Sequence, residues 1–131
     1  MKFSASVQNS SVSHKTFLKV GEKEQSINIP PKLSGGSSVT GGELLLLALA
    51  TCFCNDLYRE AGKRNIKIES LEVYADGDFD SEGKPATNIR YHAKVKTEAG
   101  EEAVRELLKH TDTVAEVQNT LRAQNSVILD L

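Results

Sequence analysis

The sequence predicts an α+β protein in which one long helix stands between two antiparallel β-regions. Apolar residues alternate with polar ones near the start of the chain and again after residue 70, a pattern typical of strands. Between these regions, residues 43–63 contain no proline and only one glycine, which favours an uninterrupted helix. Because 131 residues provide for one hydrophobic core, we expect a single domain spanning residues 1–131.

The first third of the chain has the pattern of a three-stranded meander. Apolar positions mark strands around residues 3–7, 17–20 and 27–29, with polar or glycine-containing turns between them. A Pro-Pro pair ends this region. The segment that follows, residues 34–42, is rich in glycine and serine and predicts a flexible connection.

The central helix is predicted from Glu43 to about Lys63. The run from Leu44 to Ala50 consists of residues with high helix propensity. This run is apolar on every side, so we expect it to be buried all round, in the core or in a subunit interface. Gly62 and Asn65 are suited to end the helix.

The remainder of the chain predicts a hairpin, two shorter helices and a final strand. Apolar residues alternate over residues 71–79 and 89–95, and the turn-rich segment between them favours an antiparallel pair. Helical spacing follows from about residue 100 to 110 and again over residues 114–121. The last strand is expected at residues 127–131.

Composition restricts the classes of function. The formal net charge of −2 lacks the basic excess that nucleic-acid binding requires, so no nucleic acid is expected as a partner. The chain has no secretory apolar segment near its start and no apolar run long enough to span a bilayer, so we expect a cytoplasmic protein without membrane contact. Its two cysteines form no disulfide framework, and reduced thiols are expected.

The order of elements and the helix segment 41–53 resemble the OsmC/Ohr superfamily of osmotically inducible and organic hydroperoxide resistance proteins. The resemblance covers most of the chain. It is most specific in the run Gly-Gly-Glu-Leu-Leu-Leu-Leu-Ala-Leu-Ala-Thr-Cys-Phe. It implies an OsmC-like intertwined homodimer with the two long helices central, sheets outside and two sites at the subunit interface. It also implies reduction of peroxides by a pair of cysteines, which a dithiol reductant recycles.

Cys52 matches the family's reactive cysteine, a thiolate that attacks the O–O bond and becomes a sulfenic acid. The family's second cysteine would lie within residues 114–120, where Ala115 is its counterpart, so the usual two-cysteine cycle is not available. The family's activating arginine comes from the N-terminal region, yet residues 1–58 contain no arginine. Glu43 resembles the acid at the start of the family's helix and is the second candidate catalytic residue.

Two neighbours of Cys52 have alternative interpretations. Cys54 is two residues away, and side chains so spaced on a helix point about 200° apart, so a disulfide between the two cysteines is not expected. We interpret Cys54 as filling the core. Arg59 and Asp56 have the spacing of a local ion pair, and an exposed helix salt bridge is the expected form.

No metal or other cofactor is predicted. The three histidines are scattered along the chain, and the two cysteines face opposite sides of one helix, so they lack the spacing of a zinc site. Solvated surface is the expected environment of His92 and His110.

Two functions remain open. The first is a thiol-dependent redox protein, in effect a hydroperoxide reductase or peroxidase of the oxidative stress response, that uses Cys52 and an external thiol as resolver. The alternative is a non-catalytic dimer that binds a small apolar ligand at the subunit interface. A purely structural Cys52 is a further possibility, since burial among leucines and alanines raises the pKa of a thiol.

Overall fold

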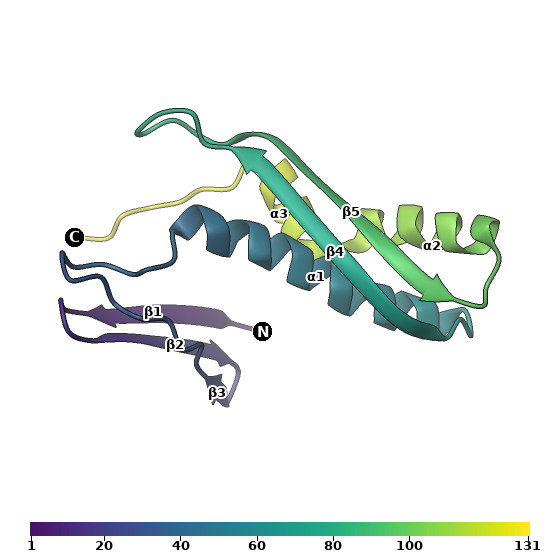
Figure 1. The fold of residues 1–131 in the computed structure, drawn as a ribbon, viewed down its shortest axis with the longest axis horizontal. Coiled ribbons are helices and arrows are strands. Elements are labelled where there is room, and N and C mark those ends of the chain that lie inside the picture. Colours follow the sequence, from purple (N-terminus) through teal and green to yellow (C-terminus); the bar gives the residue numbers. More distant parts are fainter. The chain divides into compact units, whose positions relative to one another are not determined.

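The computed structural model describes residues 1–131 and confirms the α+β class (Figure 1). The chain divides into two compact units, Met1–Leu44 and Leu45–Leu131. In chain order the elements are β1 (Phe3–Asn9), β2 (His14–Val20), β3 (Lys23–Gln25), α1 (Gly41–Lys63), β4 (Ile68–Asp78), β5 (Thr87–Thr97), α2 (Glu101–Val114) and α3 (Glu116–Arg122).

The first unit contains the predicted meander. β1 pairs with β2 and β2 with β3, both antiparallel, in the order β1-β2-β3. The third strand begins earlier than predicted, because a turn at Gly21 with φ of 57° returns the chain at once to pair beside β2. Ile27, expected within that strand, lies beyond it. There the Thr16 hydroxyl accepts from the Ile27 N–H (2.9 Å) and donates to its carbonyl (2.7 Å).

The helix α1 starts two residues before the predicted Glu43, at Gly41. Thr40 and Glu43 form a reciprocal capping box: the Thr40 hydroxyl accepts from the Glu43 N–H (3.1 Å), and the Glu43 carboxylate accepts from the Thr40 N–H (2.7 Å). The expected burial on every side is not met within one chain. Leu49 is buried, but Leu47 is 54% exposed, because the chain leaves one side of this apolar stretch uncovered.

The end of α1 is a Schellman motif. Asn65 adopts φ of 55°, its N–H donates to the Gly62 carbonyl (3.2 Å), and the Ile66 N–H donates to the Ala61 carbonyl (2.9 Å). Asparagine is one of the few side chains that tolerate this left-handed conformation. The prediction is therefore confirmed for Asn65, whereas Gly62 lies within the last turn of α1 and supplies only its carbonyl.

The strands β4 and β5 form the predicted antiparallel hairpin. The apolar pairs Leu71–Val95, Val73–Ala93 and Ala75–Tyr91 lie on its half-buried face. Phe79 and Ile89 were expected on the same face, but they are 53% and 38% exposed. The register shifts between Asp76 and Asp78, where β4 ends, so the inward alternation does not continue to these two residues.

The core of the second unit lies between the helices and one face of the hairpin (Figure 1). α2 continues four residues beyond the predicted His110 and takes in Val114, which was expected in the last helix. Only the buried Ala115 separates α2 from α3. The core cluster, against which Cys52 and the apolar face of the hairpin pack, consists of Phe53, Leu57, Ala61, Leu107 and Ala115.

The predicted final strand is absent. Residues 123–131 form neither helix nor strand, and Val127, Ile128 and Leu129 are 95%, 75% and 82% exposed. A strand is stabilised by hydrogen bonds to a neighbouring strand, and the chain supplies none to this segment. Elsewhere in the structure, no helix is both long and apolar enough to cross a membrane.

Candidate functional site

Cys52 lies half-buried on α1, with two carboxylates beside its sulfur. The Sγ atom is 3.6 Å from Oδ2 of Asp56, one turn further along the same helix. It is 3.7 Å from Oε2 of Glu116, the first residue of α3. The site thus combines one face of a helix with the start of a helix 64 residues later in the chain.

The approach of α3 to Cys52 depends on small and polar residues. Ala115 is fully buried and extended, with φ of −76° and ψ of 114°, and its small side chain lets the chain turn within the core between α2 and α3. Gln118, also buried, donates from Nε2 to the Leu49 carbonyl (3.1 Å). This bond holds α3 against α1 at the level of Cys52.

Arg59 binds the outer oxygens of both carboxylates. Its Nη1 is 2.8 Å from Oδ1 of Asp56 and 3.7 Å from Oε1 of Glu116, while its Nε donates to Glu60 (2.9 Å). The predicted pair between Arg59 and Asp56 is confirmed. The prediction that it is an exposed pair is wrong for Asp56, whose side chain is only 6% exposed because α3 covers it.

The surroundings of Cys52 favour the protonated thiol. Burial raises the pKa of Cys52 above the ordinary value, and the negative charges of Asp56 and Glu116 raise it further, while the backbone N–H of Val117 opposes them. Burial also raises the pKa of Asp56, with Glu116 adding to the effect and Arg59 opposing it. The Asp56 carboxylate is therefore a better proton acceptor than an exposed aspartate.

The pKa of Glu116 is shifted in the opposite direction from that of Asp56. A hydrogen bond from its own backbone N–H lowers the pKa of its carboxyl group, and contacts with Asp56 and Arg59 lower it further. Glu116 consequently stays ionised when Asp56 takes up a proton, so the two acids differ in their readiness to accept one.

The two cysteines have different environments, as their helical spacing predicts. Cys52 packs against the core cluster and contacts the two acids. Cys54 is a free, partly exposed thiol that does not belong to the core cluster. The interpretation of Cys54 as filling the core is thus wrong for the single chain, because the core lies on the side of the helix where Phe53 and Leu57 point.

Glu43, the other predicted site residue, is engaged at the start of α1. Its carboxylate accepts hydrogen bonds from both the N–H and the hydroxyl (2.8 Å) of Thr40. These bonds lower the pKa of Glu43, the backbone N–H first. The geometry gives Glu43 the part of a helix cap.

Sequence reasoning missed the contribution of Glu116 and the surroundings of Glu60. The only hint for Glu116 was its position directly after Ala115, the counterpart of the family's second cysteine. Glu60 is buried at 2% exposure and accepts from Lys63, Arg59 and His110, which lower its pKa to about 2. The Nε2 atom of His110 is 2.9 Å from the Glu60 carboxylate, so this histidine is not simply solvated as expected.

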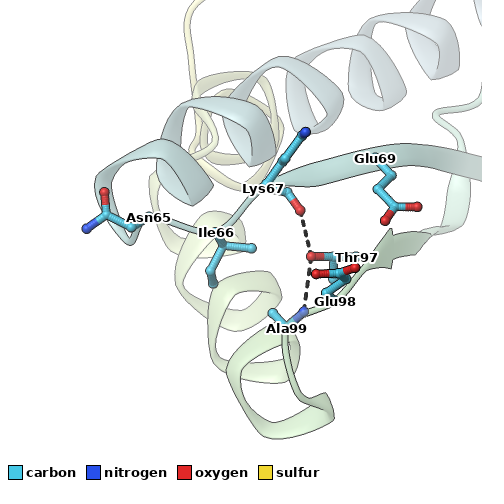
Figure 2. A pocket seen from close by; sticks show the side chains of 7 residues that line it. All are labelled: Asn65, Ile66, Lys67, Glu69, Thr97, Glu98 and Ala99. Carbon is cyan, nitrogen blue, oxygen red and sulfur yellow. Dashed lines mark hydrogen bonds between the residues drawn. The ribbon is translucent and has the colours of Figure 1, made fainter.

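A hollow beside the open end of the β4–β5 hairpin is separate from the cysteine site in the residues that line it (Figure 2). It has a volume of about 400 Å³. The Thr97 hydroxyl closes one wall by donating to the Lys67 carbonyl (2.6 Å) and accepting from the Ala99 N–H (3.3 Å). Its lining holds neither cysteine nor histidine, being formed by Asn65, Ile66, Lys67, Glu69, Thr97, Glu98 and Ala99.

A sequence model of the OsmC-like proteins matches residues 34–130, which include the central helix and Cys52. The chain belongs to the OsmC-like family. This confirms the resemblance seen in the central helix. The sequence matches none of the curated proteins.

Solved structures of OsmC-like proteins share the fold at low sequence identity. The OsmC-like protein of Mycoplasma pneumoniae is 16% identical, with a TM-score of 0.67 over 93% of this chain and 88% of the other. The organic hydroperoxide resistance protein of Elizabethkingia anophelis is 17% identical, with a TM-score of 0.63 over 93% and 89%. A putative organic hydroperoxide resistance protein of Vibrio cholerae, with captopril bound in one of its active sites, is 17% identical, with a TM-score of 0.60 over 93% and 85%.

Proposed function

We propose that this OsmC-like protein is a thiol-dependent redox protein that reduces organic hydroperoxides through Cys52, with an external thiol as resolver. The observation that carries the proposal is the hydrogen bond from the Cys52 thiol to the buried Asp56 carboxylate, whose raised pKa suits it to take the thiol proton. Family membership and the names of two relatives as hydroperoxide resistance proteins support the same reaction class.

The proposed first step transfers the Cys52 proton to Asp56 as the sulfur attacks the outer oxygen of the hydroperoxide. The S–O bond forms while the O–O bond breaks, and the departing alkoxide takes the proton from Asp56 to leave as an alcohol. Cys52 is thereby oxidised to a sulfenic acid and the hydroperoxide is reduced. The Val117 N–H, which lowers the pKa of Cys52, stabilises the anionic sulfur during the attack.

Resolution requires a partner from outside the chain. Ala115 offers no sulfur, and Cys54 lies on another side of α1. An external thiol therefore attacks the sulfenic sulfur, water departs, and a mixed disulfide forms. A second thiol, or the other sulfur of a dithiol reductant, then displaces Cys52 as a free thiol.

Glu43 is proposed to act as a positioning residue. Its capping box with Thr40 fixes where α1 begins and hence the phase of the helix that carries Cys52. The proposal places the protein in the cytoplasm, where thiol reductants are available, as a homodimer.

Treatment of the reduced protein with cumene hydroperoxide, followed by a dimedone-type reagent and mass spectrometry, tests this function. A sulfenic adduct at Cys52 is expected, with sulfinic acid increasing at higher doses because no resolver is present. Cys52→Ser should abolish both the adduct and dithiol-dependent peroxide consumption, whereas Cys54→Ser should retain them. A Cys52–Cys54 disulfide as the main product, or equal loss of activity in both variants, contradicts the proposal.

The second candidate function is binding of a small apolar ligand at a subunit interface. The raised pKa of Cys52 and the uncovered Leu47 favour it. An inert Cys52 in the peroxide experiment, together with saturable binding of an apolar fluorescent probe that Leu47→Glu removes, would support this function over reduction of hydroperoxides.

A further inference from the structure

We propose that Cys52, Asp56 and Glu116 form a three-ligand site for a zinc ion. One ligand atom from each residue lies within 4.8 Å of the other two. The three atoms are a sulfur and two carboxylate oxygens, all of which are established zinc ligands. They come from two helices, so their arrangement depends on the folded structure.

The two sulfur–oxygen separations match edges of a zinc tetrahedron. Zinc binds thiolate sulfur at about 2.3 Å and carboxylate oxygen at about 2.0–2.2 Å, and at the tetrahedral angle these bonds place sulfur and oxygen about 3.5–3.7 Å apart. In the structure, Sγ of Cys52 is 3.6 Å from Oδ2 of Asp56 and 3.7 Å from Oε2 of Glu116. Two edges of a tetrahedral site are therefore in place, and the third, between the two carboxylate oxygens, is no longer than 4.8 Å.

Arg59 contacts the carboxylate oxygens that point away from the Cys52 sulfur and leaves the two nearer oxygens for the ion. It contacts Oδ1 of Asp56 and Oε1 of Glu116, so that Oδ2 and Oε2 face the sulfur. Metal-binding carboxylates are commonly oriented by such an outer partner. Arg59 is thus a positioning residue for the ion.

The charges of the site also favour a divalent cation. With Cys52 ionised, three anionic groups face a single guanidinium, and a zinc ion makes the cluster neutral. Because the Asp56 side chain is only 6% exposed, solvent screens the repulsion among these anionic groups poorly, and a bound cation removes that repulsion.

The ligand set selects a borderline metal ion. A thiolate disfavours magnesium and calcium, which take oxygen ligands, and favours zinc, cobalt or cadmium. Binding converts the Cys52 thiol and the free ion into a metal thiolate and releases the thiol proton. Three protein ligands leave a fourth position for water.

A zinc ion at this position would block oxidation of Cys52, since the sulfur pair that attacks a peroxide would be bonded to the metal. This consequence rests on the proposed function, whereas the metal site itself does not. The site would accordingly couple the redox chemistry of Cys52 to the supply of zinc.

Titration of the reduced, metal-free protein with cobalt(II) tests the site without any redox readout. We expect one ion per chain and a thiolate-to-cobalt charge-transfer band in the near ultraviolet, with a proton released in each binding event. Zinc should displace the cobalt. Cys54→Ser is the matched control on the same helix and should leave the band unchanged, whereas Cys52→Ser should remove it.

Glu116→Gln provides a variant that should fold normally, because this side chain is 70% exposed. It should weaken cobalt binding about tenfold or more, with an unchanged circular dichroism spectrum. The absence of a charge-transfer band in the wild type, or a band that persists in Cys52→Ser, overturns the metal site. Peroxide oxidation of the metal-free protein is measured in parallel, so failure of the metal site leaves the proposed redox function intact and the reverse also holds.

Discussion

The groups around Cys52 shift the pKa of its thiol in opposite directions. Burial and the two carboxylates favour the protonated form, while the Val117 N–H favours the thiolate. Together these effects raise the pKa of Cys52. At neutral pH the resting form is therefore the protonated thiol, and another group must accept its proton during the reaction. Asp56 is the group placed to accept it.

Replacing Glu116 should make Cys52 easier to ionise. Glu116→Gln removes a negative charge 3.7 Å from the sulfur, so the raised pKa of Cys52 should fall. Below that pKa the alkylation rate follows the thiolate fraction, and the variant should react faster than the wild type at every pH in this range. The pH profile of iodoacetamide labelling at Cys52, followed by mass spectrometry in a Cys54→Ser background, measures the shift. Glu102→Gln on α2 is the control, and an unchanged profile for Glu116→Gln would count against the charge effect.

A cysteine at residue 115 should restore a resolver. Ala115 belongs to the core cluster against which Cys52 packs, and the next residue reaches the Cys52 sulfur. Ala115→Cys, in a Cys54→Ser background, should therefore form a disulfide with Cys52 after peroxide treatment, with loss of two thiols and two mass units. A lasting sulfenic acid in this variant would show that residue 115 is not the counterpart of the family's second cysteine.

At the scale of elements, the Schellman end of α1 depends on the left-handed Asn65. Asn65→Ala should cost about 1 kcal/mol of unfolding free energy, since a β-carbon without a polar side chain is disfavoured at φ of 55°. Asn65→Gly should be neutral or slightly stabilising. Urea unfolding monitored by circular dichroism separates the two, and an equal loss for alanine and glycine would mean that the Asn65 side chain itself stabilises the turn.

The buried Glu60 connects the end of α1 to α2 through His110. Its pKa is lowered from 4.5 to about 2, so its stabilising effect is present above about pH 4.5 and is lost as the pH falls toward 2. Glu60→Gln should therefore lower the melting temperature at pH 5, and the difference from wild type should shrink steadily between pH 4.5 and 2. Differential scanning calorimetry measures this, with Glu106→Gln on α2 as the control. A difference that does not change with pH would assign the effect to packing.

The sequence predicted elements wherever local chemistry defines them. The helix run from Glu43, its end near Asn65 and the hairpin all follow from propensity, turn residues and alternation. The contact between Cys52 and Glu116 could not be predicted in this way, because it joins residues 64 apart through packing around Ala115. The predicted final strand failed because strand formation depends on a partner, which the local pattern does not specify.

At the scale of the whole molecule, the chain leaves apolar surface uncovered in two places. Leu47 on α1 is 54% exposed within a stretch that is apolar on every side. The last residues, 127–131, carry further exposed apolar side chains. Exposed apolar patches favour association with another molecule, so both of these surfaces make an isolated chain in water less favourable.

We therefore expect a homodimer at micromolar concentration, in which a second copy covers the exposed side of α1. Leu47→Glu should shift the protein to monomer, since burying an unpaired carboxylate in an apolar interface costs several kcal/mol. Ala103→Glu, at an exposed position of α2, adds the same charge outside that stretch and should leave the dimer intact. Sedimentation-velocity measurements over a concentration series distinguish these states. A monomeric wild type would show that the apolar side of α1 is not covered by a second copy, and would favour an apolar ligand at that surface instead.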